Sequence, residues 1–189
     1  MELKSTLDPT NKLLRSWNPT GDPCTGSFEG VACNEHRKVA NISLQGKGLS
    51  GTLSPAIAEL KCLSGLYLHY NSLSGEIPRE LTNLAELSDL YLNVNNLSGN
   101  IPSAIGSLKK LSVVALQHNK LTGEIPSSLS NSLTLTRLDL GFNSLSGGIP
   151  LGVAQITQLE LLDVRNNSLS GIVPSGIYSP VSFYLVLPI

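Results

Sequence analysis

Histidine and cysteine are the side chains of this chain whose chemistry could support metal binding or nucleophilic catalysis. The histidines His36, His69 and His118 are scattered, and no third ligand or orienting carboxylate accompanies the last two. Cys62 has no histidine partner at a fixed spacing, and no serine stands in a nucleophile elbow. The sequence therefore predicts no catalytic residue, no metal site and no cofactor, and Cys62 is interpreted as a half-buried structural thiol.

A glycine motif of the kind that cradles phosphate occurs at Gly46-Lys-Gly48-Leu-Ser-Gly51. A nucleotide site would need a helix to begin directly after the motif and an acidic residue about 20 residues further on. Here the segment Thr52-Leu-Ser-Pro55 follows, and the glycines fall into a longer repeating pattern. We therefore expect no nucleotide binding.

The elements that must position any functional side chain come from a 24-residue repeat, which occurs six times without insertion or deletion. From its first residue the pattern runs Leu-x-x-Leu-x-Leu-x-x-Asn-x-Leu-Ser/Thr-Gly-x-Ile-Pro. A fixed period with leucines at these offsets predicts a leucine-rich-repeat solenoid, an α/β right-handed superhelix with a parallel concave β-sheet. The units begin at Val39, Leu63, Leu87, Leu111, Leu135 and Leu159.

Each unit has a strand, a turn and a convex segment. The Leu-x-Leu core predicts a short strand with the leucines inward, and the proline leads into a 3₁₀ or loop segment on the convex side. An asparagine three residues after the strand can satisfy backbone groups where the chain turns inward, so we expect a structural ladder between units. The ladder residues are Asn71, Asn95, Asn119, Asn143 and Asn167.

The repeats divide the chain into three parts. Residues 1–38 are expected to form an amino-terminal cap with one short helix ending at Asp8-Pro9 and another beginning there. Residues 39–176 hold the six repeats. Residues 177–189 form a short apolar tail without a regular cap, either an improvised lid or the end of a truncated product.

Cys24 and Cys33 bracket a short segment before the first repeat, where the solenoid needs a sealed end. A disulfide between them would stabilise the fold by about 2–3 kcal/mol. The alternative is a pair of reduced thiols in a cytosolic protein. The need to fasten a cap favours the disulfide.

The net charge and the apolar segments limit the classes of partner that the chain can bind. The net charge is −1 and the pI is near 6.3, which argues against nucleic acid and against an anionic membrane surface. No apolar signal segment follows Met1, and the apolar stretch Val181–Ile189 is too short to span a membrane. We expect a membrane connection only through segments outside this chain.

The pattern of the repeats resembles the plant-type extracellular leucine-rich repeat, as found in the ectodomains of leucine-rich-repeat receptor-like kinases and receptor-like proteins. Five units, from Leu63–Pro78 to Leu159–Pro174, carry the full motif, with Val173 replacing isoleucine in the last. The segment Leu14-Arg-Ser-Trp-Asn-Pro19 resembles the cap of that family. The resemblance implies an extracellular or outer plasma-membrane location, in which the Cys24–Cys33 bond would persist. Because no kinase domain is present, we expect the sensing half of a receptor or a secreted relative.

An extracellular setting gives meaning to three acceptor sequons for glycans. Asn41 and Asn166 fall on or beside predicted strands, where a glycan would cover part of the concave face. Asn96 falls in the loop expected after a ladder asparagine, where it would be accessible.

Outward side chains of the strands have no role in the core and form the candidate binding surface. Aromatic residues gather there beside charged ones, a composition that suits a protein or peptide interface. Cross-strand packing of the tyrosines and mutual salt bridges among the charged residues are the alternative interpretations. The candidate residues are Tyr67, His69, Tyr70, Asp89, Tyr91, Asn93, Arg137, Asp139, Phe142, Asp163 and Arg165.

Two functions are compatible with this surface. The first is a non-catalytic recognition module that binds a peptide or another leucine-rich-repeat receptor ectodomain through the concave face. The second is a secreted inhibitor of cell-wall-degrading enzymes, for which we would expect more repeats and a carboxy-terminal cysteine cap. An enzyme is disfavoured because no catalytic constellation is present.

Overall fold

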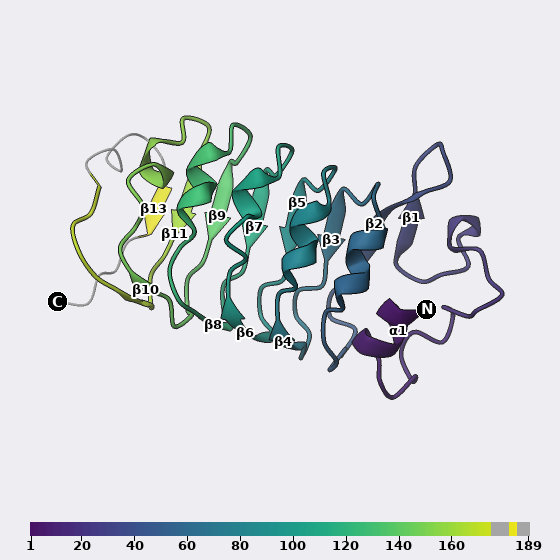
Figure 1. Ribbon diagram of the computed structural model, residues 1–189. Helices are drawn as coiled ribbons and strands as arrows, with labels where there is room; N and C mark the ends of the chain where they lie inside the picture. Colours follow the sequence, from purple (N-terminus) through teal and green to yellow (C-terminus); the bar gives the residue numbers. More distant parts are fainter. Residues whose placement is uncertain (175–181, 185–189) are drawn as a thin grey trace.

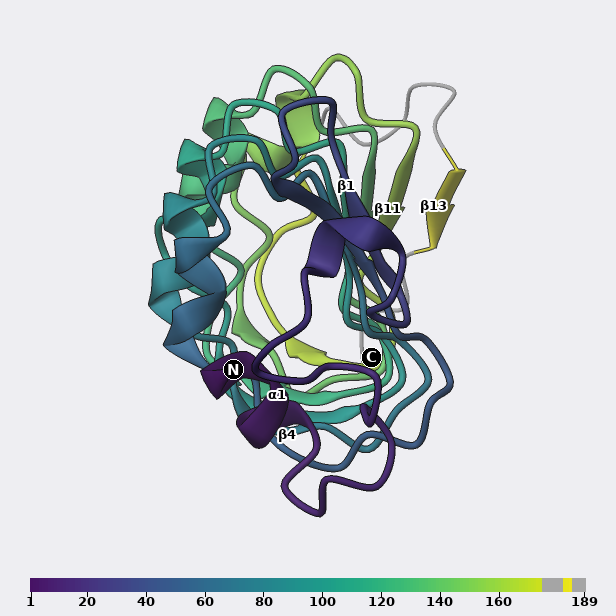
Figure 2. The same ribbon diagram turned by 90° about the vertical axis from the view of Figure 1, so that its right-hand side faces the viewer.

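Each repeat forms one turn of a coil, and neighbouring turns lie side by side along the molecule (Figure 1). The computed structural model describes residues 1–174 and the backbone of residues 182–184. The strands line one side of the coil and the short helices line the opposite side (Figure 2). The predicted solenoid with a parallel sheet is therefore confirmed.

The main sheet is built from the Leu-x-Leu segments, which alternate between the core and solvent. Within the described residues its order is β1-β2-β3-β5-β7-β9-β11-β13, and each pair from β2 to β13 is parallel. Residues one repeat apart pair directly, as Leu66 does with Leu90. The strands are β2 (Val39–Ser43), β3 (Gly65–Tyr67), β5 (Asp89–Tyr91), β7 (Val113–Ala115), β9 (Arg137–Asp139) and β11 (Leu161–Asp163).

The core is a stack of leucine side chains running through the coil. Leu66, Leu90 and Leu138 are fully buried, as are the leucines that open their repeats. Burying one such side chain contributes about 1.5–3 kcal/mol. Because each turn covers its neighbour, the repeats stabilise one another through these contacts.

On the convex side the chain forms 3₁₀ helices. Proline precedes or begins several of them, because its fixed φ suits the first turn and its missing N–H would be unpaired there. Ser54 caps the first of these helices by accepting a hydrogen bond from the Ala56 N–H. The helices are η2 (Pro55–Glu59), η3 (Arg79–Asn83), η4 (Ile105–Ser107), η5 (Ser127–Asn131) and η6 (Val153–Gln155).

A second set of parallel strands flanks the coil, and the sequence analysis does not foresee it. The Leu-Ser-Gly segments pair between repeats in the order β4-β6-β8, and β10 pairs with β12. Asn96 begins one of these strands, so its expected place in a loop is wrong. The strands are β4 (Ser74–Glu76), β6 (Asn96–Asn100), β8 (Lys120–Thr122), β10 (Ser146–Gly147) and β12 (Ser168–Leu169).

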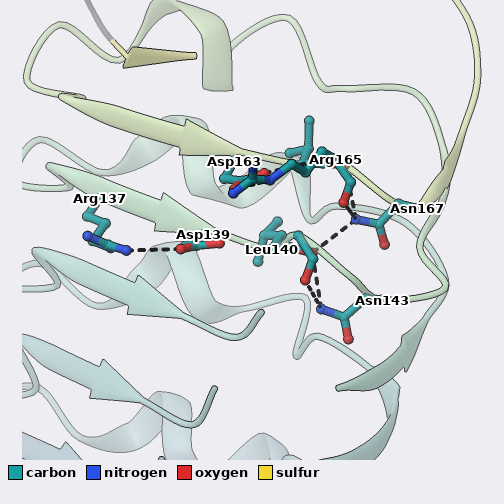
Figure 3. Close-up of polar contacts among 9 residues, drawn as sticks. Arg137, Asp139, Leu140, Asn143, Asp163, Arg165 and Asn167 are labelled. Carbon is teal, nitrogen blue, oxygen red and sulfur yellow. Dashed lines mark hydrogen bonds and ion pairs between the residues drawn. The ribbon is translucent and has the colours of Figure 1, made fainter. Parts of the chain in front are cut away.

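The ladder asparagines join consecutive turns of the coil. The Asn143 and Asn167 amides both donate to the Leu140 carbonyl, at 3.1 and 3.0 Å (Figure 3). The Asn167 carbonyl oxygen accepts the Leu145 N–H at 2.9 Å. Asn71, Asn95 and Asn119 repeat this arrangement. Each side chain thus satisfies backbone groups on two turns at once.

The cap seals the first turn of the coil. Its helix α1 (Glu2–Leu7) buries Leu7, and the Thr6 carbonyl accepts the Thr52 N–H at 2.8 Å. The prediction of a second short helix beginning at Asp8-Pro9 is wrong. Instead the Asp8 carboxylate accepts the N–H groups of residues 12–14, and these hydrogen bonds hold that segment in turns.

The remainder of the cap contains a disulfide and a hairpin. Cys24 and Cys33 are bonded, as predicted, and their Cα atoms lie 5.4 Å apart. Cys24 lies in η1 (Pro23–Thr25), and Cys33 ends β1 (Val31–Cys33), which is antiparallel to β2. Trp17 stacks on Phe28 with ring centroids 5.9 Å apart, and this pair covers the apolar end of the repeats.

Most of the tail predicted at 177–189 lies outside the described residues. The described part, β13 (Ser182–Tyr184), pairs in parallel with β11, so it continues the main sheet by one strand. No helix in the described residues is long and apolar enough to cross a membrane.

Candidate binding surface on the concave sheet

The candidate residues lie on the outward face of the main sheet, because side chains alternate along each strand. Tyr67 and Tyr91 lie directly opposite each other on β3 and β5. Arg137 and Asp139 lie on β9, and Asp163 lies on β11. The register of the strands therefore places the tyrosines in one half of this face, with Asp89 beside them, and the arginines with their aspartates in the other.

Rings in mutual contact form the aromatic half, which comprises Tyr67, His69, Tyr70 and Tyr91 and is called the aromatic cluster below. The Tyr67 and Tyr91 centroids are 5.4 Å apart, and the His69 ring lies 5.7 Å from Tyr91 and 5.4 Å from Tyr70. Gly65 leaves space for the first ring, since a Cβ there would lie 2.5 Å from the Tyr67 Cε2 atom. The Tyr70 side chain is 61% exposed. The cluster thus offers ring surface to a partner.

Burial shifts the pKa values of two residues in the aromatic cluster, Tyr67 and His69. The pKa of Tyr67 is raised, first by burial and then by the negative charge of nearby Asp89. Burial also lowers the pKa of His69, whose Nδ1 atom is enclosed. Both side chains are therefore neutral at neutral pH. Asp89 is held in place by the Ser88 hydroxyl, which donates to its carboxylate at 2.8 Å.

The charged half consists of two ion pairs, one within β9 and one between the last residue of β11 and Arg165, two residues beyond it. The Arg137 guanidinium lies 3.0 Å from the Asp139 carboxylate, and the Arg165 guanidinium lies 2.9 Å from the Asp163 carboxylate (Figure 3). Burial raises the pKa of Asp139 most strongly, with Asp163 adding to the rise, although the Arg137 hydrogen bond opposes it. Gly141 leaves room for the Asp163 carboxylate, since a Cβ there would lie 3.0 Å from an Asp163 oxygen.

Three candidate residues are less accessible than their outward position predicts. Asn93 and Asp139 are each 6% exposed, and Asp163 is 4% exposed. Their outward position on the sheet therefore does not make them exposed, and the two carboxylates are paired with Arg137 and Arg165. Asp89 is half-buried, and Phe142 remains 38% exposed.

A row of residues at the ends of the main strands has left-handed backbone. Tyr70, Val94, His118 and Phe142 all have φ of 56°, and we call these four residues the rim. The conformation costs about 1–2 kcal/mol for a residue with a Cβ. Backbone hydrogen bonds between turns impose it, as the Tyr70 N–H donates to Asn93 O at 3.1 Å and the Val94 N–H to Gln117 O at 2.9 Å.

Further contacts join the rim to the charged half. The His118 ring stacks on Phe142 with centroids 4.2 Å apart, and the Arg165 guanidinium lies 5.6 Å from the Phe142 centroid. The sequence places all four residues in one outward column, but only Tyr70 and Phe142 are among the candidate binding residues, and Val94 and His118 are not. The signal was available, since all four occupy the position before a ladder asparagine.

The sequons lie on different faces of the molecule. Asn41 is half-buried on β2, and Asn166 is exposed just after β11, so both border the concave face. Asn96 is exposed on the flanking sheet, away from that face. The described residues contain no group of three or more histidine, cysteine or acidic side chains that could hold a metal ion. Cys62 is a half-buried free thiol.

Comparison with known proteins identifies the repeats. Residues 1–34 match the leucine-rich-repeat N-terminal domain, and residues 62–84, 86–108, 110–132, 134–156 and 158–179 each match the leucine-rich repeat. The chain belongs to the leucine-rich-repeat family. The matched repeats cover more than half of its length.

Relatives of this leucine-rich-repeat protein include plant receptor kinases. The receptor protein-tyrosine kinase CEPR2 of Arabidopsis thaliana is 44% identical over 69 residues, which are 36% of this chain and 7% of that relative. The chain therefore matches only a small part of the length of the curated relative.

Solved structures similar to this leucine-rich-repeat protein are receptor ectodomains. Pollen receptor kinase 3 has a TM-score of 0.80 and 33% identity, over 90% of this chain and 83% of that one. The BIR3–SERK2 complex of Arabidopsis thaliana matches with a TM-score of 0.66 and 31% identity, over 92% of this chain and 82% of that one. The plant peptide hormone receptor RGFR1 in complex with RGF2 matches with a TM-score of 0.55 and 32% identity, over 67% of this chain and 24% of that one. The fold is thus that of a plant receptor ectodomain.

Proposed function

We propose that this chain is a non-catalytic extracellular recognition module that binds a peptide or another receptor ectodomain through its concave face. The observation that carries the proposal is the aromatic cluster on β3 and β5. Its four rings contact one another but are not sealed beneath other parts of the described chain, and Tyr70 is largely exposed. Large, rigid side chains of this kind contribute most of the binding energy at protein interfaces.

Two further features support the proposal. The Cys24–Cys33 disulfide persists in an oxidising compartment, which agrees with an extracellular location. The similar structures include a receptor–receptor complex and a peptide hormone receptor in complex with its ligand. The six-repeat surface is small, and this favours a co-receptor or a short sensing domain over a receptor that encloses a large ligand alone.

The test removes the two stacked tyrosines together. The Tyr67→Ala/Tyr91→Ala variant and the unmodified chain are compared by surface plasmon resonance against a panel of plant receptor ectodomains and secreted peptides. We expect at least one saturable binder whose affinity falls by about tenfold or more in the variant, because truncating paired interface aromatics costs more than about 1.4 kcal/mol. Thermal unfolding should change little, since both side chains lie on the surface of the sheet.

The matched control is Leu133→Ala, which truncates a side chain that is 83% exposed and lies outside the concave strands. Its affinity for the same binder should equal that of the unmodified chain. A parallel loss of affinity and melting temperature in the tyrosine variant would show that the rings support the sheet. A binder with equal affinity for the tyrosine variant and the unmodified chain would show that recognition uses another surface.

A further inference from the structure

The amino-terminal end of the core contains a cavity of about 180 Å³, which we call the cap cavity. It lies between the cap and the first repeat, at the end of the coil that faces the viewer in Figure 2. Its walls come from α1, the turns that follow it, β1, β2 and the residue after η2. The apolar residues that line it include Leu3, Trp17, Phe28, Val31, Val39 and Leu60.

The cap cavity has a buried side and a side that solvent reaches. Trp17 and Phe28 are only 6% and 8% exposed, and Ile42 behind them belongs to the buried core. Val31 and Val39 are half-buried, although they pack against the same core. A small apolar molecule can therefore enter from solvent and cover the end of the leucine stack. Filling an empty apolar volume restores contacts that its walls otherwise lack.

The interior of the cap cavity offers almost no partner for water. A buried water makes about three hydrogen bonds. The Trp17 Nε1–H is already paired, since it donates to Glu29 O at 2.9 Å. Among the lining side chains the other nitrogen or oxygen atom is the Lys4 Nζ. A dry apolar cavity of about 150 Å³ binds benzene, so the volume found here suits one aromatic ring with a short arm.

Aromatic side chains form part of the wall and favour a ring as the ligand. Trp17 and Phe28 stack with their planes 16° apart and their centroids 5.9 Å apart, and both line the cavity. A further ring can contact them in the offset or edge-to-face arrangement that aromatic pairs prefer. The remaining walls are aliphatic, so they add apolar contact without selecting another polar group.

Lys4 adds a positive charge to this apolar lining. Its Nζ donates to Trp17 O at 2.7 Å, and an ammonium group has three N–H donors. In the part of the chain that the structure describes, no carboxylate lies within ion-pair distance of Lys4. The side chain is half-buried, so a carboxylate from a ligand would gain a charge-assisted hydrogen bond there.

Acidic residues of the cap have other partners and do not compensate this charge. The Glu2 carboxylate accepts the Ser54 hydroxyl at 2.7 Å. Asp22 forms an ion pair with Arg37. The cap cavity therefore combines an apolar interior with a single cationic group that has no acidic counterpart among the described residues.

We propose that the cap cavity binds a small carboxylic acid with one aromatic ring, whose ring lies against Trp17 and Phe28 and whose carboxylate pairs with Lys4. The ligand is a free small molecule, because the volume admits about one ring and a short arm. The site is separate from the proposed function, since no lining residue belongs to the aromatic cluster. Either site can therefore fail without the other.

The test uses the fluorescence of Trp17, which is the one tryptophan of the chain and lines the cavity. The whole chain is titrated with hydrocinnamate, a phenyl ring with a short carboxylate arm. We expect a saturable change in emission with a Kd of about 1 mM or lower, and a higher melting temperature at saturation. Hydrocinnamamide lacks the charge and propionate lacks the ring, so each should bind at least about tenfold more weakly.

Three variants locate the site. Lys4→Met removes the charge but keeps an apolar stem, so it should bind hydrocinnamate about tenfold more weakly and hydrocinnamamide as before. Val31→Phe fills part of the cavity and should abolish binding of both compounds. Lys12→Met is the matched control, because Lys12 is an exposed lysine of the cap outside the cavity lining, and its affinity for hydrocinnamate should not change.

A lack of saturable binding to the unmodified chain would overturn the proposal, as would equal affinities for hydrocinnamate and its amide. If Lys4→Met lowers the melting temperature, this comparison of acid and amide on the unmodified chain decides. A peptide ending in phenylalanine that binds more tightly than hydrocinnamate would overturn the assignment to a small molecule. The Tyr67→Ala/Tyr91→Ala variant should bind hydrocinnamate normally, and a loss there would show that the compound binds the concave rings instead.

Discussion

The two halves of the concave face satisfy their outward side chains in different ways. On β3 and β5 the rings of the aromatic cluster contact one another and leave ring surface open to solvent. On β9 and β11 each buried carboxylate is paired with an arginine two residues away along the chain, Arg137 before Asp139 and Arg165 after Asp163. Between them β7 presents Val113 and Ala115, two small apolar residues.

This difference separates residues with free contact capacity from residues that serve the sheet itself. Asp139 and Asp163 face each other on neighbouring strands, so each needs its arginine to offset like charge and burial. A ligand that used these arginines would have to break both pairs. The tyrosine rings carry no charge that must be paired, and this supports the proposal that recognition uses the aromatic half.

The largest expected effect comes from the ladder that both halves share. In Asn95→Ala the carbonyls of Leu68 and Leu92 each lose one of their two ladder-asparagine donors, and the Leu73 N–H loses its acceptor. Because these groups are buried, we expect the free energy of unfolding to fall by about 3 kcal/mol. Chemical denaturation measures the change.

Asn143→Ala is the equivalent variant in the charged half, where the Asn143 amide donates to the carbonyls of Leu116 and Leu140. A loss of similar size in both variants would show that the two halves share one frame and differ only in their surface. If Asn95→Ala were neutral, the hydrogen bonds between turns would not support the aromatic half.

An intermediate effect is expected from Asp139→Asn and depends on pH. Burial raises the folded-state pKa of Asp139 above its ordinary value of 3.8, so the folded chain binds this proton more tightly than the unfolded chain. The resulting stabilisation is complete below the ordinary pKa and is lost as pH rises through the raised pKa. Asp139→Asn removes this loss, and its melting temperature should fall less than that of the unmodified chain between acid and neutral pH.

The difference in melting temperature between the two chains isolates the titration of Asp139, because Asp163, Arg137 and Arg165 remain in both. A variant that loses more stability at neutral pH than at acid pH would show that the ion pair with Arg137 outweighs the burial of Asp139. The charged half would then be a source of stability rather than a tolerated burden on the sheet.

The sequence predicts the coil well because its period is strict. Leucines such as Leu66 and Leu90 must face inward wherever the fold is a solenoid, and the ladder asparagines follow from the turn after each strand. The cap disulfide is also predicted correctly. These features depend on residue type and spacing alone, so they can be recognised before any coordinates are known.

The missed features depend on how neighbouring turns meet. The flanking strand β6 forms because backbone groups of adjacent repeats come within hydrogen-bonding distance, which the pattern Leu-Ser-Gly does not reveal. The burial of Asn93 and Asp139 depends on side chains from the neighbouring strands. The segment after Pro9 forms turns because Asp8 binds its N–H groups, an interaction that competes with helix formation.

The smallest expected effect concerns the rim and has the opposite sign. In Val94→Asn a β-branched residue at φ of 56° is replaced by one that tolerates left-handed backbone, so the free energy of unfolding should rise by up to about 1 kcal/mol. Val113→Asn is the control, since Val113 lies in the strand β7 and has no positive φ, and this variant should lose stability. A gain at Val94 with a loss at Val113, measured by denaturation, would show that the rim is kept bulky at the expense of stability, which is the pattern of a surface selected for binding. A loss at both positions would mean that the Val94 side chain stabilises the sheet by packing, and the aromatic half would then resemble the charged half in serving its own fold.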